Sequence, residues 1–235
     1  MRWTILLLLF ASIGSANAAP SRIVLLRHGE KENAYALCDI GQQRSLALRA
    51  QYLGKGAEHS IFDPQPPSAF FATTLHTLEL AAPAADSWGL PVTTYSVVPI
   101  PEQDSQEETD WITRQTQLAS SDIMNSPAWR NKTVVIVWEH KHIANHKLAK
   151  ENPDSSVELR QLLKLDQLPN KYISLVPKTW SGTNYNFFWI IDYDAAGQPV
   201  AFNTVQQTFT GKYSTLPNNQ WGAPEELPAH SRCER

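Results

Sequence analysis

Two short runs of aliphatic residues most strongly limit the folds open to this chain. Residues 23–26 read IVLL and residues 133–138 read TVVIVW, and neither run alternates apolar with polar residues. Strands buried on both faces of a parallel sheet have this continuous, β-branched pattern, whereas half-exposed strands alternate. The chain is therefore expected to build a sheet that is covered on both faces.

Helical patterns lie between these two runs. Residues 41–53 (GQQRSLALRAQYL) and 73–88 (TTLHTLELAAPAADSW) carry apolar residues at helical spacing, and a short strand at 69–72 precedes the second. Gly89 stands where helices commonly end, and Pro83 is expected to kink or shorten the second helix. Alternating strands and helices predict right-handed βαβ units. The expected fold class is α/β, a three-layer α/β/α sandwich with a mainly parallel central sheet.

The pattern changes in the C-terminal part of the chain. Residues 187–193 (FFWIIDY) and 201–210 (AFNTVQQTFT) predict two strands, and the short AAGQP connection favours an antiparallel pair at the sheet edge. A further strand is expected at 95–100. No linker divides the chain, so residues 19–235 are expected to form a single domain, with residues 214–235 as an irregular tail.

The N-terminal segment MRWTILLLLFASIGSANA has the features of a secretory signal peptide, residues 1–18. Arg2 precedes an apolar stretch that is shorter than the roughly 20 residues needed to span a bilayer. Ala16-Asn17-Ala18 is a small-x-small cleavage site, and no cysteine follows it to carry a lipid anchor. We therefore expect a secreted or periplasmic protein without a membrane anchor.

Charge and composition exclude some classes of partner. The 235 residues carry a formal net charge of −3, which gives no electrostatic basis for binding nucleic acid or an anionic membrane. A small anionic substrate would need positive charge placed locally at its site. The sequence leaves the oligomeric state undetermined.

In an oxidising compartment, the two cysteines, Cys38 and Cys233, would be able to form a disulfide. A disulfide between them would tether the C-terminal tail to the start of the domain. The sequence gives no distance between the thiols, so the pairing stays open. A nucleophilic Cys38 is disfavoured, because no neighbouring residue would activate its thiol.

Both buried runs end in residues that suit chemistry at the sheet edge. The first is followed by Arg27-His28-Gly29 and the second by Glu139-His140. Ligands of open parallel sheets bind beyond the carboxyl ends of the strands, so neighbouring strands would bring His28 and His140 to one rim. An imidazole nitrogen can attack phosphorus, Arg27 can hold two phosphoryl oxygens, and Gly29 permits close approach of the backbone. For either strand alone, the alternative is an ordinary polar turn.

The residues Leu26-Arg27-His28-Gly29-Glu30 resemble the signature of the histidine phosphatase superfamily, which has the phosphoglycerate mutase-like fold. The spacing Leu37-x-x-x-Gly41-x-x-Arg44 resembles the entry into the first helix of that family. Residues 71–85 resemble the segment that carries a second phosphate-binding arginine, and residues 135–140 (VIVWEH) resemble the strand that delivers a second histidine. The resemblance therefore extends in order from residue 23 to about residue 148.

The resemblance implies a phosphatase that hydrolyses phosphomonoesters through a phosphohistidine intermediate, with no cofactor and no metal. It implies His28 as the nucleophile, with Arg27 and His140 holding the transferred group of a small phosphorylated substrate. The remaining expected substrate-binding residues are Gly29, Glu30, His76 and Glu139. A mutase is disfavoured, because export would separate it from glycolytic substrates. The alternative is a member of the fold that has weak or no activity and binds phosphate or another anionic ligand.

The family uses a carboxyl group to protonate the leaving oxygen. The candidates here lie in PEQDSQEET, and they are Glu102, Asp104, Glu107 and Glu108. Glu102 is favoured because it lies nearest the end of the strand expected at 95–100. The competing interpretation is a solvated acidic loop, since a proton donor must lie within reach of the leaving group.

The chain departs from the family pattern at His76, which stands where the second arginine is expected. A neutral imidazole supplies one donor and no charge, whereas a guanidinium supplies a fixed fork of donors. Loss of such a contact costs on the order of 10²–10³ in rate. A protonated His76 would favour acidic conditions. The alternative is an exposed helix residue outside the site.

Two further segments leave alternatives open. His142 and His146 are four residues apart, as in a zinc-protease helix, but Ile143 stands where the general-base glutamate belongs, so no metal site is expected. The polar and aromatic segment 180–185 either lines the mouth of the substrate site or packs over the sheet edge.

Overall fold

The computed structural model describes residues 18–102 and 104–234, so the expected signal peptide lies outside the described residues except for Ala18. The strands are β1 (Arg22–Arg27), β2 (Pro67–Ala72), β3 (Val92–Thr94), β4 (Thr133–Trp138), β5 (Phe187–Tyr193) and β6 (Pro199–Gln206). The α-helices are α1 (Asp39–Leu48), α2 (Leu75–Trp88), α3 (Ser105–Asn125), α4 (His140–Ile143), α5 (His146–Glu151), α6 (Leu159–Leu162) and α7 (Asn170–Ile173). Within the described ranges, no helix combines the length and the apolar character needed to cross a membrane.

The six strands form one sheet in the order β3-β2-β4-β1-β5-β6. The three pairs β2–β3, β2–β4 and β1–β4 are parallel, whereas β1–β5 and β5–β6 are antiparallel. This arrangement confirms the mainly parallel α/β sheet with an antiparallel pair at one edge. In the register of β1 and β4, Arg27 lies opposite Trp138, so the residues that follow both strands meet at one rim of the sheet.

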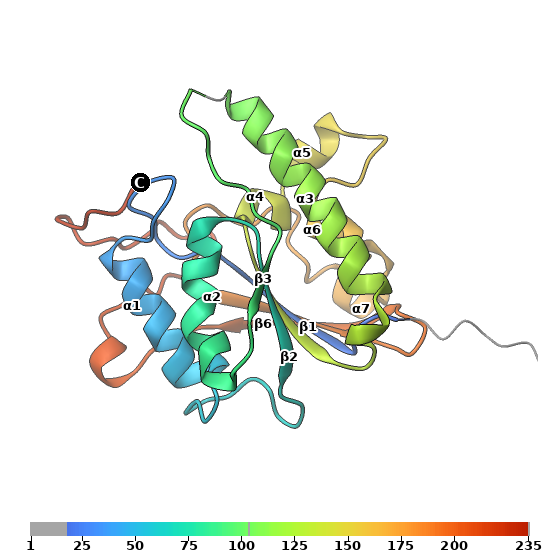
Figure 1. Cartoon of the computed structure of the whole chain (residues 1–235), viewed down its shortest axis with the longest axis horizontal. Coiled ribbons are helices and arrows are strands. Elements are labelled where there is room, and N and C mark those ends of the chain that lie inside the picture. Colours follow the sequence, from blue (N-terminus) through green and yellow to red (C-terminus); the bar gives the residue numbers. More distant parts are fainter. Residues whose placement is uncertain (1–17, 103, 235) are drawn as a thin grey trace, which may run out of the picture.

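Both faces of the two central strands are buried, as their continuous apolar pattern predicts. Ile23 and Leu25 of β1 pack into one core, while Val24 and Leu26 pack into the other. Figure 1 shows the sheet between α1 and α2 on one side and α3 with the shorter helices on the other. The three-layer sandwich follows from this two-sided burial, which satisfies the apolar side chains on each face of the strands.

The first two helices confirm their sequence patterns with small changes at their ends. Thr77 Oγ1 accepts a hydrogen bond from the Thr74 N–H group at 2.8 Å, which caps the start of α2. The helix continues through Pro83 and ends before Gly89, whose φ of 68° lies in the left-handed region. The segment expected as one helix over 41–53 instead divides into α1 and a π-helical turn, Arg49–Leu53.

Gly41 allows α1 to approach the loop that follows β1. A Cβ atom at this position would lie 2.2 Å from the carbonyl oxygen of Glu30, a distance that no side chain tolerates. Close packing of α1 against the backbone of Glu30 therefore requires a glycine at position 41.

Two expectations need correction, and one helix was not expected. Residues 95–100 do not form a strand: the backbone N–H groups of Tyr95 and Val97 still bond to residues at the end of β2, but the chain then leaves the sheet near Pro99, which has no N–H to donate. The strand β6 ends at Gln206, earlier than residue 210. The long helix α3 fills a region to which the sequence analysis assigned no element.

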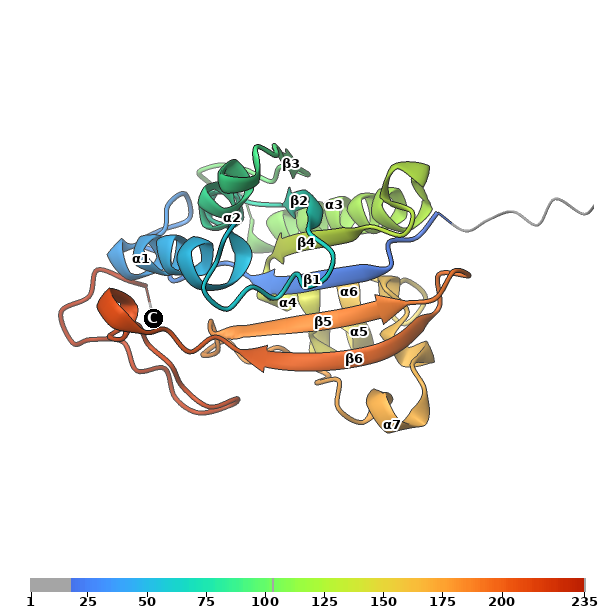
Figure 2. The same cartoon turned by 90° about the horizontal axis from the view of Figure 1, so that it is seen from below.

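The cysteine pairing, which the sequence left open, is decided by the fold. Cys38, directly before α1, forms a disulfide with Cys233 across 195 residues of sequence. The Glu234 N–H group also donates to the carbonyl oxygen of Lys31 at 2.7 Å. Figure 2 shows the C-terminal tail beside α1. Among the described residues 214–234 there is no helix or strand, so these contacts attach an irregular segment to the domain.

Candidate active site

The ends of β1 and β4 bring His28 and His140 together. The His28 N–H group donates to the carbonyl oxygen of Trp138 at 3.1 Å, which extends the parallel pairing one residue beyond β1. Strand β4 ends at Trp138, and His140 begins α4 two residues later. As a result, His28 Nε2 lies 3.2 Å from His140 Nδ1. The two histidines thus lie on one rim, as the neighbouring strand ends predict.

The protonation of His28 follows from its hydrogen bonds. Nδ1 lies 2.7 Å from the carbonyl oxygen of Gly29, and a carbonyl oxygen only accepts, so Nδ1 carries the hydrogen. The other nitrogen, Nε2, therefore presents a lone pair. Burial, aided by the nearby charge of Arg27, lowers the pKa of His28 to about 3. His28 is consequently a neutral imidazole whose free nitrogen faces His140.

Arg27 is held in place on three sides. Its Nη2 atom lies 3.0 Å from His28 Nε2 and 3.1 Å from His140 Nδ1, so its two hydrogens can reach both imidazoles. Its Nη1 atom donates to the carbonyl oxygens of Ser181 and Gly182, at 3.2 and 2.7 Å. The guanidinium also lies 3.8 Å from the ring centroid of Tyr185, within cation–π distance.

The segment 180–185 contacts both the core and the cluster at the strand ends. Trp180 is buried and packs against Trp189 with ring centroids 4.9 Å apart, whereas Tyr185 lies on Arg27 at the site. Sequence reasoning did not assign Tyr185 to the site. A polar and aromatic segment close to a strand was the available signal, but nothing in it indicated which aromatic ring faces Arg27.

Glu139 places a carboxylate inside this cluster. Its Oε2 lies 3.4 Å from His28 Nε2, and its Oε1 lies 3.6 Å from His76 Nδ1. The Thr74 hydroxyl donates to Oε1 at 3.1 Å. Burial acts to raise the pKa of Glu139, but the contacts with His28 and His76 outweigh it and hold this pKa well below its usual range. An ionised carboxylate thus lies beside the free nitrogen of His28.

His76 belongs to the same cluster. The residue is buried, with an exposed fraction of 3%, so the alternative of an exposed helix residue is wrong. Its Nε2 donates to the carbonyl oxygen of Asn33 at 3.2 Å, and its Nδ1 lies 3.0 Å from the Thr74 hydroxyl oxygen. The ring centroids of His76 and His28 are 5.9 Å apart, and Glu139 contacts both rings.

Two residues of the RHGE motif have partners within the protein in place of the expected substrate. Both carboxylate oxygens of Glu30 accept hydrogen bonds from Arg44, at distances down to 2.5 Å, and this ion pair is fully buried. A Cβ atom on Gly29 would approach Leu80, Gly41 and Leu37 at 3.2–3.3 Å. Glu30 therefore anchors α1, and Gly29 permits tight packing while its carbonyl oxygen orients His28.

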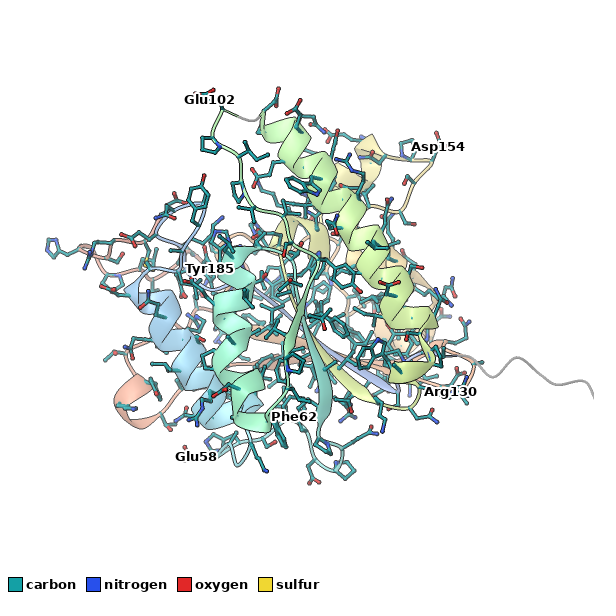
Figure 3. All side chains as sticks on the ribbon, viewed as in Figure 1. Glu58, Phe62, Glu102, Arg130, Asp154 and Tyr185 are labelled. Atoms are coloured by element: carbon teal, nitrogen blue, oxygen red, sulfur yellow. A yellow bond between two sulfur atoms is a disulfide. The ribbon has the colours of Figure 1, made fainter. Side chains whose placement is uncertain are left out.

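The acidic segment before α3 is not brought to the histidines. Glu102 is exposed, with a φ of 72°, and Figure 3 places it at the tip of the loop before α3, apart from Tyr185. Asp104 caps α3 by accepting from the Gln106 N–H group at 2.7 Å. Glu107 and Glu108 lie in the first turn of the same helix. Within the described ranges no contact joins these four acids to His28, so the proton-donor role of Glu102 stays a prediction without geometric support.

One group of potential metal ligands occurs among the described residues, and it is the cluster of His28, Glu139 and His140. Their ligand atoms lie within 4.8 Å of one another, but Arg27 Nη2 already contacts both imidazole nitrogens. A dication there would have to displace a fixed guanidinium. His142 and His146 do not converge: His142 is buried, with its Nε2 3.1 Å from the Thr113 hydroxyl oxygen, and His146 is exposed.

No protein-family model and no curated protein matches this chain. Among solved structures, it is similar to the native structure of a mycobacterial glucosyl-3-phosphoglycerate phosphatase, with 12% identity, a TM-score of 0.41, and coverage of 81% of this chain and 99% of that one. It is also similar to a proposed phosphohistidine phosphatase, SixA, from Nakamurella multipartitia, with 12% identity, a TM-score of 0.36, and coverage of 81% and 98%. Both proteins are named as phosphatases. Similarity at this level does not assign an activity or a substrate to this chain, whose chemistry rests on the geometry of its own site.

Proposed function

We propose that this chain hydrolyses phosphomonoesters through a transient phosphohistidine at His28. The observation that carries the proposal is the hydrogen bond from His28 Nδ1 to the Gly29 carbonyl oxygen, 2.7 Å long. It fixes the tautomer in which Nε2 carries the lone pair, the form that a nucleophilic imidazole needs once a phosphoryl oxygen takes over the Arg27 hydrogen bond to that atom. Arg27 supplies a permanent positive charge 3.0 Å from that same atom.

The roles of the cluster follow from these positions. As the bond from His28 Nε2 to phosphorus forms, the ester P–O bond breaks and the leaving oxygen takes a proton from a solvent water molecule. Water then attacks the phosphohistidine and releases phosphate. Arg27 stabilises the negative charge on the phosphoryl oxygens, which is where most catalysis of phosphoryl transfer arises. His140 can donate to another phosphoryl oxygen when its Nδ1 atom carries the proton, a tautomer in which that atom no longer accepts from Arg27 Nη2.

A second candidate function is a member of this fold that binds phosphate or another anionic ligand without turnover. Two observations favour it. The carboxylate of Glu139 lies 3.4 Å from the nucleophilic nitrogen, and the four acids before α3 make no described contact with the site. An enzyme without a placed proton donor would release poor leaving groups slowly.

The proposal includes export of the protein. The signal-like segment at residues 1–18 and the disulfide between Cys38 and Cys233 support an oxidising compartment. N-terminal sequencing of the protein purified from the outside of expressing cells is expected to begin at Ala19. A protein that retains its first residues and stays within the cytosol would contradict this part of the proposal.

One experiment separates the two candidate functions. Wild type and His28→Ala are incubated with p-nitrophenyl phosphate between pH 4 and pH 8, and the quenched protein is analysed for phosphohistidine. Turnover and trapped phosphohistidine in wild type alone are the expected results. If wild type shows neither while still binding phosphate, the ligand-binding function is favoured. If wild type and His28→Ala show equal turnover, the proposed nucleophile is wrong.

A further inference from the structure

Glu139 lies where a non-bridging phosphoryl oxygen must also be accommodated. A phosphoryl group poised for attack has its phosphorus about 3–3.5 Å from the nucleophile. Glu139 Oε2 already lies 3.4 Å from His28 Nε2, so an oxygen of the entering group would contact this carboxylate. The site therefore presents an anion to an anionic ligand.

The charges around Glu139 do not offset two further negative charges. The titratable groups that face it from β1, the following loop, α2 and α4 are Arg27, His28, Lys31, His76, His140 and His142. Burial keeps His28, His140 and His142 as neutral rings, because it lowers the pKa of each one. Arg27 is formally balanced by Glu139 itself, which leaves Lys31 as the remaining lysine or arginine charge in this set, and one charge does not offset two. A dianionic phosphate would therefore enter a site with little net positive charge.

Among the described residues, two donors close to Glu139 already have acceptors. The Thr74 hydroxyl already donates to Glu139 Oε1 at 3.1 Å, and His76 Nε2 donates to the Asn33 carbonyl oxygen. A hydrogen on the phosphoryl oxygen would convert the repulsion into an O–H···O⁻ hydrogen bond, which is among the stronger kinds. A phosphomonoester carries that hydrogen below its second pKa, about 6.

We propose, resting on the proposed function, that Glu139 makes this site bind a phosphoryl group together with one proton, shared between the carboxylate and a phosphoryl oxygen. The substrate class is thus the singly charged form of a phosphomonoester. Burial leaves His28 with a pKa of about 3, so the nucleophile stays unprotonated at the mildly acidic pH at which this form prevails.

The position of Glu139 argues for this role over that of leaving-group acid. In an in-line displacement, the attacking and leaving atoms lie on opposite sides of phosphorus. Glu139 Oε2 lies beside the attacking atom, so it reaches a non-bridging oxygen and not the departing one. Glu139 is therefore a specificity residue for the protonation state of the ligand.

The test measures binding of methylphosphonate and difluoromethylphosphonate to the full chain by calorimetry from pH 4 to pH 9. Fluorine lowers the second pKa of the phosphonate, while the two ligands have similar size. Wild-type affinity is expected to fall about tenfold for each pH unit above the second pKa of each ligand, because the bound proton becomes scarcer. The decline should begin at lower pH for the fluorinated ligand. Titration in two buffers of different ionisation enthalpy should show uptake of one proton in that range.

The matched variants separate Glu139 from carboxylates in general. Glu139→Gln is expected to bind both phosphonates at least tenfold more tightly than wild type at pH 8, with a flattened pH profile. Glu58→Gln removes an exposed carboxylate far from the site and should match wild type (Figure 3). Thermal melting verifies that each variant is folded. If Glu139→Gln does not fold, the comparison of two ligands on wild type still decides the question.

The outcomes distinguish this inference from the function on which it rests. Binding by wild type that does not change across either ligand's second pKa would overturn the role of Glu139 and leave the phosphatase proposal intact. An unchanged pH profile in folded Glu139→Gln would also overturn it. No phosphonate binding at any pH, together with no trapped phosphohistidine, would overturn both.

Discussion

The Nε2 atom of His28 lies 3.4 Å from the Oε2 atom of Glu139, although the residues follow different strands. The parallel pairing of β1 with β4 produces this contact, because it aligns the ends of the two strands at one rim. The cluster thus combines a neutral imidazole, a fixed guanidinium and a carboxylate. This combination differs from a site built only of cations, because the carboxylate would repel a fully ionised phosphoryl group.

Arg27→Lys is expected to lower kcat by about 10²–10³ while leaving the fold intact. Lysine keeps the positive charge but cannot reach both imidazoles and two carbonyl oxygens while lying on Tyr185. Steady-state kinetics with p-nitrophenyl phosphate measure the effect. Arg49→Lys, an exchange at an exposed position, is the control and should have wild-type activity. A decrease below threefold in Arg27→Lys would show that a fork of donors is not required.

Acid is expected to destabilise the protein through His28. Its pKa is about 3 in the folded protein and about 6.5 in the unfolded chain, so between these values the unfolded chain binds more protons. The contribution to stability is therefore complete above pH 6.5 and declines as the pH falls toward 3, by about 2–3 kcal/mol between pH 7 and pH 4. Urea unfolding at several pH values should show a shallower decline in His28→Gln. His59→Gln, at a half-exposed position, should keep the wild-type slope.

The buried ion pair of Glu30 and Arg44 is expected to be tolerated in the fold only when both charges are present. Glu30→Leu or Arg44→Met alone should lower the free energy of unfolding by about 3–5 kcal/mol, because each leaves one buried charge unpaired. The double variant Glu30→Leu with Arg44→Met should lose less than the sum of the single changes. Denaturant titration measures all three variants.

A partly exposed ion pair serves as the control for the variants of Glu30 and Arg44. Arg160 contacts Asp166, which is about half exposed, so Asp166→Asn should cost less than about 1 kcal/mol. Additive losses at Glu30 and Arg44 would contradict the assignment of these residues as one interacting unit.

Loss of the Cys38–Cys233 disulfide is expected to destabilise the domain by about 2–5 kcal/mol, since it closes a loop of 195 residues. Cys233→Ala should lower the midpoint of urea unfolding to that of the reduced wild type. Adding reductant to the variant should then have no further effect. A reductant-sensitive midpoint in Cys233→Ala, or an insensitive one in wild type, would be inconsistent with this pairing.

The amino-acid sequence determined the parts of the fold that depend on local pattern. The continuous apolar runs gave β1 and β4, because strands covered on both faces have no polar side to display. Helical spacing located α2, and the short Gly-Pro connection indicated the antiparallel pair β5 and β6. The arrival of His28 and His140 at one rim followed from the geometry of parallel strands.

Local pattern was less informative where side chains are mostly polar. Much of α3 faces solvent, and residues such as Thr116 and Ser120 supply part of its buried face, so its helical period gave only a weak signal. The segment 95–100 has strand-forming residues, yet it continues only briefly beside β2 before leaving the sheet. The strand preference of individual residues does not produce a strand when the segment has no neighbouring strand to pair with.

The composition of the site was decided by tertiary structure. The sequence marked Glu30 and Glu139 alike as substrate-binding residues, but the fold pairs Glu30 with Arg44 and places Glu139 against His28. It likewise buries His76, separates Glu102 from the histidines and brings Tyr185 onto Arg27. Such contacts join residues distant along the chain, and neither residue type nor spacing encodes them. The sequence alone determined which strands end in functional groups, whereas packing of the loops and helices decided which of those groups meet.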